Sequence, residues 1–157
     1  RRVLLRKPVA IRRYKWLGTI RTSRNYQLTF NIRPTGVGLG NVLHFTAGGN
    51  IGAKGTRIPG IWMYRGTTRL HIRSGRAGNH NDGCDPRREL ARNRTTRVKI
   101  RVAGGELKVW YNGRLVCRSS NYRSPDQAAR PVHVYVADPW HRSVQGTVSK
   151  LVYQKLR

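Results

Sequence analysis

The segment from Arg97 to Cys117, RVKIRVAGGELKVWYNGRLVC, constrains the fold more than any other part of the chain. Val98, Ile100 and Val102 alternate with basic residues, which is the period-two pattern of a strand with one buried and one solvated face. A Gly-Gly pair then predicts a reversal, and Asn112-Gly113 predicts a two-residue type I′ turn, which needs positive φ at both positions. The segment therefore predicts a three-stranded antiparallel meander and requires no helix.

Further strands are expected on both sides of this meander. Tyr26 to Ile32 alternates four apolar with three polar residues, and weaker strand patterns cover residues 41–46, 61–64, 69–73, 132–138 and 146–153. The 157 residues suit one domain, while 17 Gly and 7 Pro match many turns better than long helices. We therefore predict a single all-β domain over residues 1–157, an antiparallel β-sandwich in which residues 1–16 form a basic N-terminal segment.

Several ring side chains fall within the predicted strands. For Trp62, Trp110 and Tyr135 we expect positions in the core, where strand aromatics usually pack. His44 lies inside the run NVLHFT, and we interpret it as a hydrogen-bonded strand histidine and not as a metal ligand.

The charge balance limits the partners that this chain can have. It has 32 Lys and Arg against 6 Asp and Glu, a formal net charge of +26 and a sequence pI near 11.8. Self-repulsion on this scale opposes the compact state, so a polyanionic partner should stabilise it. Most of the cations are arginine, whose planar guanidinium grips oxyanions through paired hydrogen bonds. Solubility alone does not require so large an excess.

The candidate polyanion-binding residues are cations at outward strand positions or in a basic cluster. The outward cations are Arg69, Arg73, Arg97, Lys99, Arg101 and Arg114. The cluster is Arg12, Arg13 and Lys15, which alternate with Tyr14 and Trp16 as basic and aromatic residues do at sulfated-glycan sites. An edge strand with a solvated basic face is the alternative interpretation of this cluster.

Cysteines and a sequon point weakly to the secretory route. Cys84 and Cys117 are expected to form a disulfide, with two buried free thiols as the alternative. Asn93-Arg94-Thr95 is an N-glycosylation acceptor sequence. The sequence starts at Arg1 without Met, so we expect a processed or excerpted start. No stretch approaches the roughly 18 apolar residues of a membrane span, and we expect a secreted or extracellular-matrix protein.

The order of these segments resembles the concanavalin A-like jelly roll, the superfamily of legume-type lectins, laminin-G-like modules, pentraxins and family 16 glucanases. The resemblance rests on the strand 26–32, on NVLHF with GIWMYRGTTRLHIR, on TRVKIRVAGGELKVWYNGRLV and on a final GTVSKLVY. One laminin-like feature is missing, because Thr95-Thr96 stand where Trp-His usually precedes the strand. The resemblance implies two antiparallel sheets, a last strand paired near the first, and one concave, often ligand-binding face.

We expect no enzyme activity and no cofactor. Glycosidases of this fold class use paired carboxylates about 5 Å apart, and none of the six acidic residues here pairs at i, i+2 within a strand. Calcium is the one metal considered, since Asn79, Asn81, Asp82 and Asp85 bring oxygen ligands together. Neighbouring arginines repel cations, and a turn held by Asx side chains and a disulfide is the favoured interpretation.

Three functions compete. The first is a structural or matrix protein that binds or self-assembles with an extended polyanion, including an anionic mineral such as silica, whose silanols accept hydrogen bonds from guanidinium groups. The second is a lectin-like binder of sulfated or acidic polysaccharides. Nucleic-acid binding is less favoured, because no helix-turn-helix, zinc module or aromatic RNA-binding signature is present.

Overall fold

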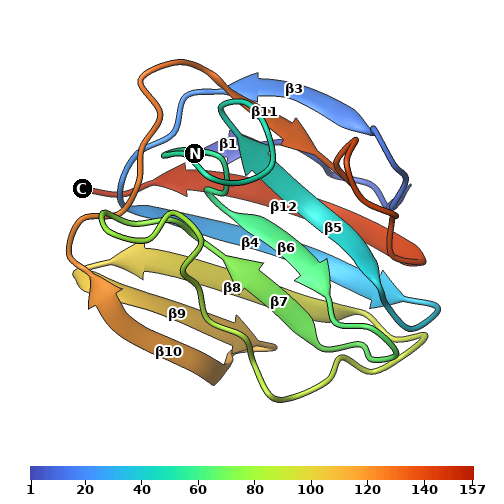
Figure 1. Ribbon diagram of the computed structural model, residues 1–157. Coiled ribbons are helices and arrows are strands. Elements are labelled where there is room, and N and C mark those ends of the chain that lie inside the picture. The colour runs from blue at the N-terminus through green and yellow to red at the C-terminus, as the bar shows by residue number, and fades with distance from the viewer.

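A computed structural model describes all residues, 1–157, and contains β-strands with no helix (Figure 1). The strands are β1 (Arg2–Val3), β2 (Val9–Ala10), β3 (Trp16–Ile20), β4 (Tyr26–Pro34), β5 (Gly40–Thr46), β6 (Gly60–Met63), β7 (Leu70–Arg73), β8 (Thr96–Ala103), β9 (Gly105–Tyr111), β10 (Arg114–Tyr122), β11 (Val132–Tyr135) and β12 (Gly146–Lys155). All strand pairs are antiparallel.

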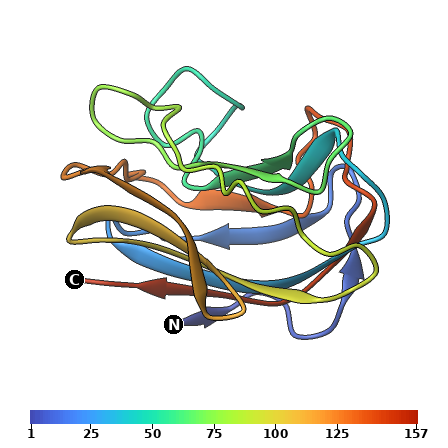
Figure 2. The same ribbon diagram turned by 90° about the horizontal axis from the view of Figure 1, so that it is seen from below.

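The strands form two stacked sheets (Figure 2). The seven-stranded sheet has the order β1-β12-β4-β8-β9-β10, with β2 also paired to β12, and the five-stranded sheet has the order β3-β11-β5-β6-β7. The predicted sandwich is therefore confirmed. The last strand pairs with β1, β2 and β4, so the N-terminal segment joins the seven-stranded sheet.

One hydrophobic core lies between the sheets. Alternate residues of the central strands are fully buried there, among them Leu28, Phe30, Val98 and Ile100 from one sheet and Phe45 from the other. Period-two burial in β4 and β8 follows the predicted alternation residue by residue. Burial of these side chains is the main source of stability.

The turns and strand ends agree with the sequence in most places. Asn112 and Gly113 have φ of 50° and 82°, as the type I′ turn requires. Strand β11 ends at Tyr135, although the pattern predicted a strand to Asp138; beyond Tyr135 the backbone of Val136 and Ala137 hydrogen-bonds to the 12–15 turn, and the Asp138 amide donates to the Asn41 side chain. Trp16–Ile20 was not predicted as a strand and forms the edge strand β3.

A disulfide joins Cys84 to Cys117, as predicted, with Cα atoms 6.0 Å apart. It links β10 of the seven-stranded sheet to the long β7–β8 connection, which lies beside the five-stranded sheet. No helix in the structure is long and apolar enough to cross a bilayer.

Candidate functional site: the aromatic face

Ring side chains cover the outer side of the five-stranded sheet, and we call this surface the aromatic face. Core residues such as Ile61 and Phe45 alternate with them along each strand, so the rings must point away from the core. The face comprises Trp16, His44, Trp62, His71, His133 and Tyr135 on the strands, with Tyr14, Tyr64, Trp140 and His141 beside them.

The rings of this face touch one another in an unbroken series. Tyr14 packs edge-on against Tyr135, with centroids 6.0 Å apart, and Tyr135 in turn meets Trp140 at 6.2 Å. His44 lies between Trp140 at 5.6 Å and Trp62 at 5.1 Å. Edge-to-face contacts of this kind add to the stability from burial alone, so the rings form one rigid surface.

The prediction of core positions was wrong for Trp110 and Tyr135, whereas Trp62 is buried as expected. Trp62, Trp110 and Tyr135 all lie outside the hydrophobic cluster between the sheets. Trp62 and Tyr135 belong to the aromatic face, whereas Trp110 lies on the outer side of the seven-stranded sheet beneath Lys99. Alternation shows which residues of a strand lie on the same side of the sheet. It does not show which of the two outer surfaces of the sandwich carries the rings.

Trp62 is buried although it lies outside the core, at 7% exposure. A Cβ atom at Gly60 would come within 2.5 Å of the Trp62 ring, so the glycine leaves the space that this ring fills. The Arg57 guanidinium stacks on the ring at 4.2 Å and is itself fixed by hydrogen bonds to Asn50 and Asn81. Arg57 thereby holds the 47–59 connection against the sheet.

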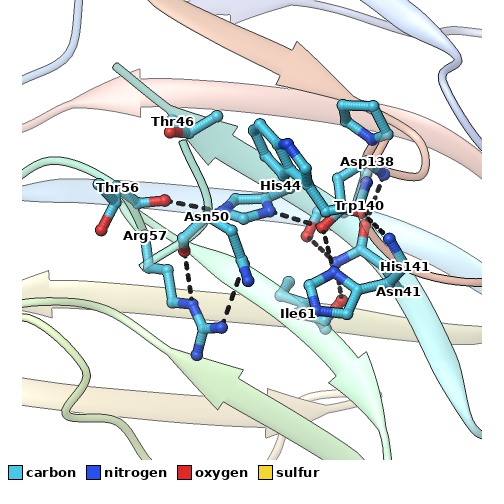
Figure 3. A network of polar contacts seen from close by, with 12 residues as sticks. Asn41, His44, Thr46, Asn50, Thr56, Arg57, Ile61, Asp138, Trp140 and His141 are labelled. Atoms are coloured by element: carbon cyan, nitrogen blue, oxygen red, sulfur yellow. Dashed lines mark hydrogen bonds and ion pairs between the residues drawn. The ribbon is translucent and has the colours of Figure 1, made fainter. Parts of the chain in front are cut away.

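Asp138 is the centre of a buried polar network beneath the rings (Figure 3). One carboxylate oxygen accepts from the backbone amides of Trp140 and His141, and the other lies 2.8 Å from Nδ1 of both His44 and His141. The Asp138 amide donates to Asn41, whose side-chain NH₂ donates to backbone carbonyls of β5 and β6. The network therefore fixes the start of the β11–β12 connection on the sheet.

His44 is held in this network through both of its ring nitrogens. Its Nε2 lies 2.7 Å from the Thr56 carbonyl oxygen, and its Nδ1 lies 2.8 Å from the Asp138 carboxylate. Burial alone would raise the pKa of Asp138, but hydrogen bonds from His44 and His141 outweigh burial and hold that pKa below its ordinary value. The predicted hydrogen-bonded role of His44 is thus confirmed.

Asp85 is the centre of a second cluster, at the β7 edge of the aromatic face. Its oxygens accept hydrogen bonds from Tyr64, His71, Arg73 and the Ile72 amide. Burial tends to raise the pKa of Asp85, yet these hydrogen bonds lower it far below the ordinary value. Arg69 completes the cluster by donating to the Asp85 and Pro86 carbonyls and packing over the Tyr64 ring.

The predicted cations are divided among three places. Arg12, Arg13 and Lys15 occupy the turn before β3, where hydrogen bonds tie the chain to Val136 through Pro139 beside the aromatic face. Arg69 and Arg73 belong to the Asp85 cluster, and Arg73 pairs with Asp85. Arg97, Lys99 and Arg101 lie on the outer side of the seven-stranded sheet, with Arg114 after the turn that hydrogen-bonds to Arg97.

The oxygen atoms considered for calcium are engaged with arginine or with the backbone. Asn81 accepts from Arg57, Asp82 pairs with Arg76, and Asp85 pairs with Arg73. Asn79 caps the turn by accepting from the Asn81 amide. The loop therefore has the Asx-stabilised geometry that the sequence favoured.

The exposed rings of the aromatic face determine which ligands this surface can bind. Tyr14, Trp16 and Trp140 are 67%, 53% and 43% exposed, and Trp16 is oriented by donating to His133. Exposed rings held rigidly on a sheet suit flat ligands with apolar faces, such as sugar rings. Cations of the 12–15 turn adjoin these rings, so the surface suits a ligand that also carries negative charge.

Comparison with known proteins supports the fold assignment. No family model matches the chain, and no curated protein matches its sequence. Among solved structures, domain 4 of AbnA, a GH43 extracellular arabinanase from Geobacillus stearothermophilus in complex with arabinotriose, is similar with a TM-score of 0.62 and 17% identity, over 88% of this chain and 65% of that one.

Two other similar structures belong to different proteins. A native heptameric SAP-like pentraxin from Limulus polyphemus gives a TM-score of 0.57 at 17% identity, over 88% of this chain and 67% of that one. Trypanosoma rangeli sialidase gives 0.55 at 17% identity, over 83% of this chain and 20% of that one. The chain thus has the concanavalin A-like jelly-roll fold, as its sequence resemblance implied.

The aromatic face as a unit was not predicted from the sequence. Tyr14 and Trp16 were expected beside the basic cluster, Tyr135 and Trp62 were expected in the core, and Trp140 was not assigned a place. The available signal was that rings recur at outward positions of several strands, since His71, His133 and Tyr135 each alternate with aliphatic residues.

Proposed function

We propose that this protein is a non-enzymatic, lectin-like binder of acidic glycans, and that the glycan lies on the aromatic face. The observation that carries the proposal is the exposure of Tyr14, Trp16 and Trp140 beside the cations Arg12, Arg13 and Lys15. Rings of this kind stack on the apolar faces of sugars, while guanidinium groups bind the carboxylates or sulfates that an acidic glycan carries.

The distribution of charge favours an acidic ligand over a neutral one. Ion pairs with carboxylates engage Arg73, Arg76, Lys108 and Arg118, and the other Lys and Arg side chains have no carboxylate partner. The positive field therefore extends into solvent, where it attracts anions and raises their rate of association. The mineral hypothesis, with silica as its example, stays a prediction from this charge alone.

A binding role without catalysis is supported by the state of the carboxylates. The pKa values of Asp85 and Asp138 are both lowered, whereas a general acid for glycoside cleavage needs a raised pKa. Each of these two carboxylates is also saturated with donors. As part of the same proposal we assign the protein to the extracellular space, where a disulfide persists.

The test measures affinity for a sulfated or uronic-acid oligosaccharide by calorimetry in wild type, Trp16→Ala, Trp140→Ala and Trp110→Ala. We expect Trp16→Ala and Trp140→Ala each to weaken binding about tenfold, as loss of an aromatic anchor does. Trp110→Ala is the matched control, because it removes the same side chain from the other outer face. Weakening by Trp110→Ala alone would move the ligand to the seven-stranded sheet and refute the proposal.

A further inference from the structure

A hollow at one end of the sandwich is lined by three arginines that the function above does not use. It has a volume of about 560 Å³ and is formed by residues 36–39 together with Arg65, Arg92, Arg142, Ser143 and Gln145. The arginines come from three separate connections, β6–β7, β7–β8 and β11–β12. The volume falls within the usual range for small-molecule sites.

The three arginines have no partner inside the protein. None forms an ion pair, none donates a hydrogen bond, and no acidic residue lines the hollow. All three are exposed. A guanidinium keeps its charge at any biological pH, so mutual repulsion cannot be relieved by loss of a proton. An incoming anion is the remaining way to neutralise this charge.

The backbone holds the three arginine-bearing segments against a common strip of chain, residues 34–41. The amide of Gly66 donates to the Gly38 carbonyl at 2.6 Å, next to Arg65. The Asn93 amide, next to Arg92, donates to Pro34 at 2.7 Å, and the Arg142 carbonyl accepts from Asn41 at 2.7 Å. The positions from which the arginines project are therefore fixed before a ligand arrives, which lowers the entropic cost of binding.

We propose that Arg65, Arg92 and Arg142 form a binding pocket for a tetrahedral oxyanion, a sulfate or phosphate ester group. Guanidinium groups arriving from three segments suit an anion with three or more free oxygens better than a carboxylate with two. The Ser143 hydroxyl and the Gln145 amide supply neutral donors at the same hollow. Val37 and Leu39, exposed at 46% and 55%, form an apolar rim for the group that carries the ester.

The experiment compares glucose 6-sulfate, glucose 6-phosphate, inorganic sulfate and glucuronate by calorimetry at about 0.15 M salt, where long-range attraction is screened. We expect saturable binding of an ester that Arg65→Gln, Arg92→Gln and Arg142→Gln each weaken about tenfold, as loss of a hydrogen bond to a charged group does. Arg24→Gln is the matched control, since Arg24 is exposed, unpaired and outside the hollow. Its effect should stay below about twofold.

Each outcome decides for or against the pocket. A preference for the sulfate or for the phosphate ester identifies the natural form, and binding of inorganic sulfate at equal strength means that the carrier is not contacted. Equal weakening by Arg24→Gln, unsaturable binding, or glucuronate bound as tightly as the esters overturns the proposal. Trp16→Ala should leave ester binding unchanged, so failure here is distinguishable from failure of the aromatic face.

Discussion

The two outer faces of this sandwich have opposite characters. The aromatic face has rings above a buried network in which Asp138 and Asp85 are saturated with donors. The outer side of the seven-stranded sheet, which we call the basic face, carries Arg97, Lys99, Arg101, Lys108 and Trp110. Its contacts are exposed ones: Lys99 packs on Trp110 at 4.5 Å, Arg101 donates to Gln27 at 3.3 Å, and Lys108 pairs with Glu106 at 3.5 Å.

The difference follows from the lengths of the connections. On the basic face, Gly104 alone joins β8 to β9, and the two-residue turn Asn112-Gly113 joins β9 to β10. The connections 47–59, 74–95 and 136–145 adjoin the five-stranded sheet, and Figure 2 shows the first two rising beyond it. Long connections supply the groups that shape a site. Charge is therefore found on both faces, but only the aromatic face has rings supported by a buried polar network.

The largest expected effect comes from breaking the network under the rings. Asp138→Asn removes the anionic partner of His44, and both side chains are fully buried. We expect a loss of about 3 to 5 kcal/mol in the free energy of unfolding, because an amide has one acceptor oxygen and cannot accept from all four donors that the carboxylate engages. Urea unfolding measures it. Asp82→Asn is the control, since its ion pair with Arg76 is partly exposed and should cost about 1 kcal/mol at most.

The next largest effect concerns the disulfide that links the two sheets. Replacing Cys84 and Cys117 by Ser opens a link that spans 33 residues, which the chain-entropy model values at about 3 to 4 kcal/mol. Unfolding of wild type with and without reductant, compared with the double variant, measures this stabilisation. If the double variant also loses glycan binding at a temperature where it stays folded, the link positions the aromatic face as well as stabilising it.

The sequence predicted the basic face much better than the aromatic one. Local rules sufficed for the meander of β8 to β10, because alternation and the Asn112-Gly113 turn involve neighbours in sequence. Asp138 meets His44 across 94 positions, and Arg57 reaches Trp62 only because Gly60 leaves space. Contacts between a connection and a distant strand produce no periodic pattern in the sequence. The Asp138 network and the ring surface therefore could not be predicted from alternation.

Acid should weaken the Asp85 cluster of the aromatic face. The folded-state pKa of Asp85 is lowered, so its stabilisation is complete above the unfolded pKa of about 3.9 and is lost as the pH falls through the folded value. Asp85→Asn should lose about 1 to 3 kcal/mol at neutral pH and show a flatter decline below pH 4. Thermal unfolding from pH 7 to 2 measures this, and parallel curves for the two proteins would contradict it.

The smallest expected effect is on the basic face. The experiment distinguishes binding that depends only on net charge from binding at a defined site. Lys99→Gln with Arg101→Gln should change the free energy of unfolding by less than about 0.5 kcal/mol, because these side chains make few contacts. Arg12→Gln with Arg13→Gln removes the same charge beside the aromatic face. We expect only the second pair to lower affinity for an acidic oligosaccharide, by several-fold, when both are measured by calorimetry at physiological salt. Equal losses from the two pairs would mean that the glycan responds to net charge, and the distinction between the faces would then hold for structure but not for binding.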